Sequence, residues 1–185
     1  MQSLQDHFLI AMPAMGDPNF NETVTYIFEH SENDGALGII INRPLDMQLG
    51  EIFNQLSLGV ADQSQAQKPV LNGGPIHRNR GFVIHKSVQH YDSTLETPTG
   101  FKVTTSRDIL GSMAGGGEPQ LTLVALGCAG WEAGQLELEL SANTWLIVPA
   151  DPSIVFETPF KLRWAAAAGL LGVDISQLSS YAGHA

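Results

Sequence analysis

The chain has little of what several large classes of protein need. It contains one cysteine, Cys128, so no disulfide can form within the chain, which agrees with a reducing compartment. No apolar run approaches the roughly 20 residues that a membrane-spanning helix needs. The sequence also begins without the basic residue and apolar stretch of a secretory signal. We therefore expect a cytoplasmic protein that does not enter a membrane.

Positive charge is also scarce. The chain has 9 Lys and Arg residues against 19 Asp and Glu, which gives a net charge of −10. Proteins hold the phosphate backbone of nucleic acids mainly through Lys and Arg, so we expect no direct binding to DNA. The densest basic stretch holds Arg78, Arg80 and Lys86. It is either a solvated edge, which we favour, or a small local anion site.

What the chain does contain is enough apolar sequence for a core. With 185 residues, 43% of them hydrophobic, it fits a single globular domain that buries roughly 70% of its unfolded surface. No internal repeat of 20 to 50 residues is visible, which argues against a solenoid or propeller. The polar stretch 62–69 is interpreted as a surface loop within this domain.

Hydrophobic periodicity predicts strands and helices in mixed order. The predicted strands are 23–30, 36–42, 70–72, 81–85, 101–105, 121–126 and 145–148, and the first two form a β-hairpin through Asn33-Asp34-Gly35. The predicted helices are 49–56, one that Ser106 caps and Gly115 ends, one from Trp131 to Leu140, and two that start at Asp151-Pro152 and Thr158-Pro159. The stretch 135–140 also alternates like a strand, but its residues are good helix formers. Without regular βαβ alternation, the order indicates an α+β fold.

The last predicted helix carries its own packing expectation. Periodicity predicts that it ends at Gly172 and buries a face of Leu162, Ala165, Ala166 and Leu170.

Cys128 has two readings. It follows a strand that looks buried and precedes a predicted helix, and a helix dipole stabilises a thiolate at its N-terminus. The alternative, which we favour, is a small buried thiol in a tight glycine-rich turn, because free cysteine is among the most buried residue types. The nucleophile-elbow pattern is incomplete, since Leu126 stands where its first glycine belongs.

The histidines do not indicate a metal site. There is no second cysteine, and the spacing of a zinc site is absent from His30, His77, His85 and His90. His85 is more simply a hydrogen-bonded histidine at the rim of the sheet. A triad of Cys128, His85 and Glu29 can be written from residue types alone, but it has no support without geometry.

Glycine-rich stretches give no cofactor signature either. Neither Asn72-Gly73-Gly74-Pro75 nor Gly115-Gly116-Gly117 matches a phosphate-binding loop, so both are interpreted as turns and no cofactor is expected. Asn42-Arg43-Pro44 is more informative, because an arginine that follows an apolar strand presents a planar donor at a loop. The other reading of Arg43, which we favour from the residue types alone, is a surface ion pair with one of the many acids.

Short blocks of distinctive sequence are spread over the whole chain. They are Phe8-Leu9-Ile10-Ala11-Met12-Pro13, Asp17-Pro18-Asn19-Phe20, Glu29-His30, Gly38 to Pro44, Gly73-Gly74-Pro75, Arg80 to His85, Ala129-Gly130-Trp131, Gly134-Gln135-Leu136-Glu137 and Asn143-Thr144-Trp145-Leu146. In order and spacing these blocks resemble the bacterial YqgE/AlgH family, from His7 to the tail at 182–185.

This resemblance implies a mixed, bent β-sheet that curls into a pseudo-barrel flanked by helices. It also implies a cytosolic bacterial protein of unsettled biochemical activity. Some members carry the label of transcriptional regulator through a link to alginate production, a label that says nothing about mechanism. Many relatives are expected to have an aromatic residue, usually tyrosine, at the position of Cys128, so a family-wide activity would not depend on this thiol.

Polar residues of these blocks stand at the edges of apolar strands, where a packed core does not require their identities. We therefore expect loops and strand ends to bring them together around one groove. The residues are Asp17, Asn19, Glu29, His30, Asn42, Arg43, Asn72 and His85.

Two functions of different class remain open. The favoured hypothesis is a non-enzymatic regulatory or adaptor protein whose groove binds a small ligand or a protein partner, with Asn42 and Arg43 as anchoring donors. The alternative is an unrecognised hydrolase or transferase, or a redox-sensing protein, that uses Cys128 or His85 with Glu29.

Overall fold

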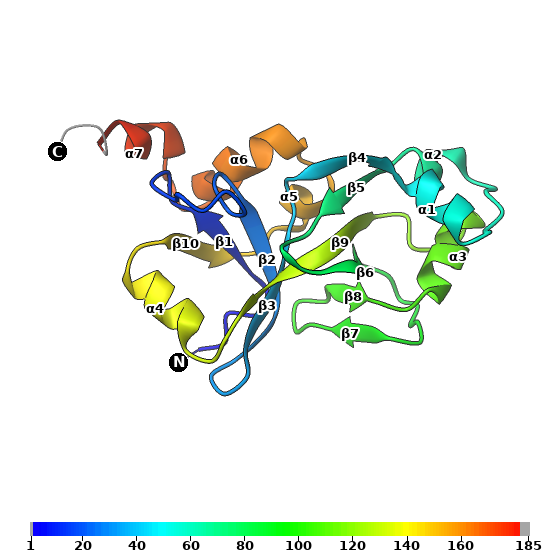
Figure 1. Cartoon of the computed structure of the whole chain (residues 1–185), viewed down its shortest axis with the longest axis horizontal. Helices are drawn as coiled ribbons and strands as arrows, with labels where there is room; N and C mark the ends of the chain where they lie inside the picture. Colours follow the sequence, from blue (N-terminus) through cyan, green and yellow to red (C-terminus); the bar gives the residue numbers. More distant parts are fainter. Residues whose placement is uncertain (1, 182–185) are drawn as a thin grey trace.

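The computed structural model describes residues 2–181, and its main feature is one long curled sheet with helices on both faces (Figure 1). The strands are β1 His7–Ala11, β2 Val24–Ser31, β3 Gly35–Ile40, β4 Pro44–Gln48, β5 Pro69–Asn72, β6 Ile76–His85, β7 Thr94–Glu96, β8 Lys102–Thr104, β9 Thr122–Trp131 and β10 Trp145–Pro149. The expected α+β fold, with a bent sheet that forms a half-barrel, is confirmed. The end of the family resemblance, 182–185, lies outside the described residues.

The helices are mostly short. They are α1 Leu49–Gln55, α2 Gln63–Ala66, α3 Asp108–Ala114, α4 Gln135–Ser141, α5 Pro152–Phe156, the 3₁₀ helix η1 Phe160–Leu162, α6 Arg163–Gly169 and α7 Ile175–Tyr181. Within residues 2–181, no helix has the length and apolar character needed to cross a bilayer.

Strand β9 joins the two halves of the sheet. The strand order is β10-β1-β2-β3-β9-β6-β8-β7, and β5 pairs with β9 in parallel while β4 pairs with β5. The last residues of β9, Ala129 to Trp131, pair with β3, whereas Thr122 to Cys128 lie beside β6. Because one long strand serves both halves, the sheet bends along it. The predicted hairpin of β2 and β3 is confirmed.

Two glycines allow the turn between β5 and β6 to cross β9 at close range. Gly74 has φ +150° and Gly127 has φ +80°, and a Cβ on Gly74 would lie 2.2 Å from the carbonyl of Cys128. A Cβ on Gly127 would lie 2.6 Å from the carbonyl oxygen of Gly74. A side chain at either position would clash with the backbone, so both glycines are needed where the β5–β6 turn crosses β9.

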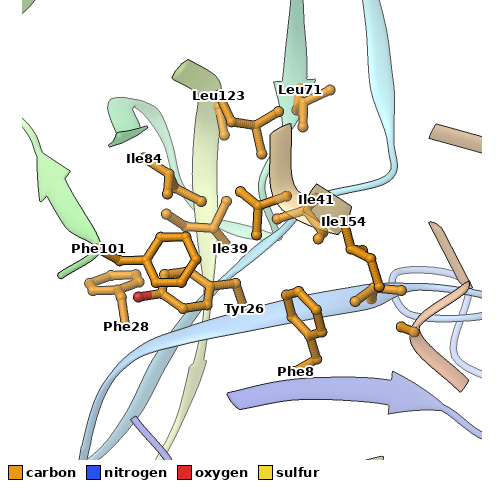
Figure 2. Close-up of a cluster of buried hydrophobic side chains, with 14 of the residues drawn as sticks. Phe8, Tyr26, Phe28, Ile39, Ile41, Leu71, Ile84, Phe101, Leu123 and Ile154 are labelled. Atoms are coloured by element: carbon orange, nitrogen blue, oxygen red, sulfur yellow. The ribbon is translucent and has the colours of Figure 1, made fainter. Parts of the chain in front are cut away.

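Hydrophobic residues cover both faces of the sheet. On one face, the main core packs the sheet against α5 and α6, and the rings of Tyr26 and Phe101 meet there with centroids 5.0 Å apart (Figure 2). On the other face, α1, α2 and α3 cover one end of the sheet and α4 covers the opposite end (Figure 1). Adjacent residues of β6 show the division, because Phe82 and Ile84 belong to the main core while Val83 packs under α1 and α3.

The predicted packing face of the helix after Pro159 is wrong except at Ala166, which is half-buried against the main core. This helix, α6, also ends at Gly169 rather than at Gly172. The buried residues are Arg163, Ala167 and Ala168, whereas Leu162 and Leu170 are 57% and 44% exposed and Ala165 is exposed as well. The helix starts with the 3₁₀ turn η1, which has three residues per turn and shifts the phase of everything after it. The guanidinium of Arg163 then occupies the interior, where Nη1 donates to the carbonyl of Ile41 at 2.6 Å.

Two predicted boundaries also differ. The strand expected at 121–126 continues as β9 to Trp131, so α4 begins at Gln135 rather than at Trp131. The stretch 62–69, expected as a loop, contains α2, whose cap Asp62 accepts from the amide of Ser64. The helical assignment of 135–140 is confirmed.

Helix caps were predicted with mixed success. Asp151 caps α5 with Pro152 in the first turn, as its sequence indicates. Ser106 does not cap α3, because the chain enters the helix one residue later and Arg107 holds the cap position. The hydroxyl of Thr158 donates to the carbonyl of Ser153 instead of capping the helix that follows.

Candidate functional site

Arg43 lies between β3 and β4, and its donors are bonded within the chain. Nη1 donates to the carbonyl oxygens of Pro18 and Asn19 at 2.8 and 2.7 Å. Nη2 donates to the backbone and side-chain oxygens of Asn21, both at 2.9 Å. Arg43 therefore clamps the loop before β2, and the acid partner considered in the sequence is replaced by carbonyl groups.

Neighbouring residues complete this clamp. The side chain of Asn42 accepts from the amide of Val24 at 3.0 Å and donates to the carbonyl of Glu22 at 2.9 Å. The amide of Asn72 donates to the carbonyl of Arg43 at 2.8 Å. With Asp17 and Asn19 in the clamped loop, five of the eight predicted groove residues share one region. Their hydrogen bonds hold loops and strand ends together.

Glu29 and His30 lie at the opposite end of β2. His30 Nδ1 accepts from the amide of Leu4 at 3.0 Å, so the ring proton is assigned to Nε2, which donates to Glu137 at 2.8 Å. His30 thus ties the N-terminal segment and α4 to the sheet. A hollow of about 660 Å³ beside it is lined by the carboxylates of Glu29, Asp34 and Glu132.

His85 lies in a third region, apart from the surroundings of Arg43 and from the end of β2 that holds Glu29 and His30. It is buried at the end of β6, with Nε2 2.7 Å from the hydroxyl of Thr104 and Nδ1 3.1 Å from that of Ser87. Burial, helped by the positive charge of Lys102 and by His90, lowers the pKa of His85 to about 4. His85 is therefore neutral at physiological pH, and it lies inside the sheet rather than at an open rim.

The register separates His85 from Glu29. Glu29 pairs with Leu37, which pairs with Gly130, whereas His85 pairs with Thr122. The two residues are thus aligned with positions eight residues apart along β9. The eight predicted groove residues consequently occupy three regions, and the pair of His85 and Glu29 named in the alternative hypothesis is not brought together.

Cys128 lies inside β9, so the reading at a helix N-terminus is wrong, and of the favoured reading the burial is confirmed while the turn is replaced by a strand. The side chain is fully buried, and burial raises the pKa of the thiol to about 11 despite the opposing effect of Arg80. A hollow of about 230 Å³ above it is also lined by Glu29, His77 and Arg80. Among residues 2–181, no three His, Cys, Asp or Glu side chains gather as metal ligands.

A cavity that the sequence did not reveal lies between α1, α3 and one face of β6, β8 and β9. Its volume is about 380 Å³. The apolar lining is Met47, Ile52, Leu56, Val83, Leu110, Val124 and Leu126. The polar lining is Gln55, Arg78, Asn79, Thr104, Thr105, Ser106 and Arg107, with Gly81 at one wall. An apolar pocket with a few convergent polar groups is the usual form of a small-molecule site.

An irregularity in β6 shapes this cavity. The pairing with β9 shifts between Ile76 and Gly81, and His77 takes a left-handed conformation with φ +49°. As a result Arg78 lines the cavity, while Arg80 lines the hollow above Cys128 on the other face. Gly81 leaves room beside them, because a Cβ there would have no atom within 4 Å.

The two arginines of the cavity have donors to spare. Arg78 Nε donates to the carbonyl of Pro75 at 3.3 Å, and Arg107 Nη2 donates to the carbonyl of Leu56. Neither forms an ion pair with any group in the described part of the chain. The lining contains no Asp or Glu. The basic stretch at Arg78 and Arg80 was the signal in the sequence, where a small anion site was the less favoured reading.

Comparison with known proteins places this geometry in a family. A sequence model described as AlgH-like matches residues 8–176. A UPF0301 protein of Xanthomonas campestris is 50% identical over 182 residues, covering 98% of this chain and 96% of the relative. A UPF0301 protein of Xanthomonas euvesicatoria is 49% identical with the same coverage.

Solved structures agree. The solution structure of the AlgH protein from Pseudomonas aeruginosa has a TM-score of 0.81 at 49% identity, covering 100% of this chain and 97% of that one. A crystal structure of a protein from Corynebacterium diphtheriae has a TM-score of 0.71 at 21% identity, covering 97% and 93%, and it supports the fold alone. None of these names specifies a reaction or a ligand.

Proposed function

We propose, from the premise that this chain belongs to the AlgH-like family, that it is a non-enzymatic regulatory protein of the cytosol that binds a small ligand. The observation that carries the proposal is the cavity of about 380 Å³ between α1, α3 and the sheet. It lies within the range of volumes that small-molecule sites have, and it combines an apolar floor with polar groups at its rim.

The groups named for an enzymatic alternative do not support one. A thiol with its pKa raised to about 11 is almost fully protonated at neutral pH, so Cys128 is a poor nucleophile. His85 is enclosed by the sheet and has hydroxyl partners, with no carboxylate to orient it. Catalysis by either route would need a rearrangement of β6 or β9.

A regulatory role fits the position of the cavity. Its roof is formed by α1 and α3, which are seven residues each and pack on the sheet through Leu49, Phe53, Ile109 and Met113. A ligand beneath these helices would contact Ile52 and Leu110 directly and would favour one placement of the roof. A protein partner that contacts the outer surface of the helices could then distinguish the occupied from the empty state.

The proposal is tested by ligand retrieval with a cavity-filling variant. Purified protein is equilibrated with a bacterial metabolite extract, and retained molecules are identified by native mass spectrometry. Gly81→Leu places a side chain in the cavity, since position 81 shares a face with Val83. Gly16→Leu is the matched control, because Gly16 is exposed and has free space for a Cβ.

We expect the wild type and Gly16→Leu to retain the same small molecule and Gly81→Leu to lose it. Circular dichroism and thermal unfolding of both variants establish that they are folded. Equal retention by folded Gly81→Leu, or no retained molecule in the wild type, would refute a ligand site in this cavity.

A further inference from the structure

The charge of the cavity differs in sign from that of the whole protein. The chain carries a net charge of −10, yet the cavity is lined by two arginines and by no carboxylate. A guanidinium without an ion-pair partner at the rim of an apolar pocket is solvated. It binds an anionic ligand more favourably than a neutral one.

We propose that the ligand is an amphiphile with an oxyanion head group, a carboxylate or a phosphate, that Arg78 and Arg107 bind. This inference rests on the proposed function and specifies the chemistry of its site. The head group lies at the rim, where both arginines are exposed to solvent, and the apolar body lies on Val83, Val124 and Leu126.

Arginine suits this role because of its geometry. The planar guanidinium presents paired N–H groups that match the two oxygens of a carboxylate or phosphate. In Arg78 the terminal nitrogens have no partner within residues 2–181, so they are available without breaking a bond. The side chain of Asn79 also lines the cavity and supplies a further polar contact to the head group. The hydroxyls of Thr105 and Ser106 are already bonded, to Ser93 and to Asp108.

The apolar lining determines how long the apolar part of the ligand is. Each buried methylene contributes about 0.8 kcal/mol, so affinity should rise about fourfold per methylene until the cavity is full. A volume of about 380 Å³ is near the lower end for ligand sites, which favours a medium-length chain over a long lipid tail.

Binding of a matched series of eight-carbon probes tests the inference. Octanoate, octyl phosphate, octanol and octylamine are titrated below their micelle concentrations, by isothermal calorimetry or by NMR. We expect both anions to bind at least tenfold more tightly than octanol, because charge-assisted hydrogen bonds exceed neutral ones. We expect octylamine to bind more weakly still. The ratio of the dissociation constants of octanoate and octyl phosphate identifies which oxyanion the site prefers.

Substitution of the arginines localises the effect. Arg78→Gln should lower the affinity for octanoate at least tenfold and should change the affinity for octanol little. Arg80→Gln is the matched control, since it makes the same change in net charge two residues away but lines the opposite face. Arg80→Gln should leave both affinities unchanged, and the affinity for octanoate should fall as salt is raised.

The outcomes separate this inference from the proposal beneath it. If octanol binds as tightly as octanoate, or if Arg78→Gln and Arg80→Gln behave alike, the oxyanion assignment is wrong while the ligand cavity stands. If none of the four probes binds, the proposal that the ligand is an amphiphile is also wrong. Metabolite retrieval then tests independently whether the cavity is a ligand site. If folded Gly81→Leu binds octanoate as the wild type does, the cavity is not the site and both proposals fail.

Discussion

At the scale of single residues, Cys128 shows how strongly reactivity depends on the element that holds a side chain. The thiol lies inside β9, buried, with its pKa raised from 9.0 to about 11. At neutral pH this leaves about a hundredfold less thiolate than an unperturbed thiol would have, in addition to the steric protection. We predict that an aromatic disulfide reagent labels native protein at least a hundredfold more slowly than protein unfolded in urea.

Cys128→Ala provides the blank for this measurement. Labelling of the native protein at the rate of the unfolded chain would contradict the buried placement and would revive the reactive-thiol hypothesis.

The lowered pKa of His85 predicts that the stability of the protein depends on pH. Its pKa is about 4 in the folded protein and 6.5 in an exposed histidine, so between these values the unfolded state binds a proton that the folded state does not. The contribution of neutral His85 is therefore complete above pH 6.5 and is lost as the pH falls toward 4. Its size is about 2 kcal/mol, after allowance for screening by solvent.

Urea unfolding between pH 4 and pH 7.5 measures this effect. In His85→Gln, which does not titrate, the decrease in the free energy of unfolding over this window should be smaller than in the wild type. Parallel curves for the two proteins would show that His85 is protonated equally in both states.

Arg43 marks the limit of prediction at this scale. The sequence offered two readings of Arg43, a donor that anchors a ligand and a surface ion pair with an acid. It could not show that the partners are the carbonyls of Pro18, Asn19 and Asn21, since these bonds depend on how the loop folds back.

At the scale of elements, α4 is attached to the sheet by one carboxylate that two indoles share. Glu139 Oε2 accepts from Trp131 Nε1 at 2.9 Å and from Trp145 Nε1 at 2.8 Å, and its other oxygen accepts from Gln135 at 3.0 Å. The tryptophans of two family blocks thus meet at α4, on the face opposite the main core. Their role is structural.

We predict that Glu139→Ala lowers the free energy of unfolding by about 2 to 4 kcal/mol, because two indole N–H groups lose a charged acceptor. Glu132→Ala, an exposed carboxylate with the same change in charge, should change it by less than about 0.5 kcal/mol. Chemical unfolding followed by tryptophan fluorescence measures both. If Glu139→Ala does not change the free energy of unfolding, α4 is held by apolar packing and by the bond between His30 and Glu137 instead.

The elements that periodicity predicted are those with uninterrupted patterns, such as the hairpin of β2 and β3 and helix α1. The full length of β9 was missed because Gly127 and Gly130 read as the end of a strand. In the structure Gly127 permits the close approach of the β5–β6 turn. The packing face of α6 was missed because η1 shifts the helical phase, which no short-range pattern encodes.

At the scale of the whole molecule, the fold class could be predicted and the site could not. The family blocks indicated a bent sheet with flanking helices, and the structure confirms it. The shared polarity of the eight groove residues was visible, but their positions depend on long-range register, as the separation of Glu29 and His85 along β9 shows. The cavity was hidden because its apolar lining residues have the identities of ordinary core residues and its polar ones are typical of a solvated surface.

The net charge of −10 also leads to a prediction about DNA. The field of the protein opposes approach to a phosphate backbone, and the two basic residues of η1 and the start of α6, Lys161 and Arg163, are not both available. Arg163 is buried and bonded to the main chain. Fluorescence anisotropy at about 0.1 M salt should therefore show no binding to duplex DNA tighter than about 10⁻⁶ M. Nanomolar affinity of the isolated protein for a defined duplex would restore the hypothesis of a direct regulator.

The location of a bound ligand tests the central claim most directly. Amide resonances of isotopically labelled protein are followed by NMR during titration with octanoate. The account predicts that shifts concentrate in the segments around the cavity, at 47–56, 78–83, 104–110 and 124–126. Shifts centred instead on the loop at 17–22 with Asn42, Arg43 and Asn72, or no saturable shifts at all, would contradict it.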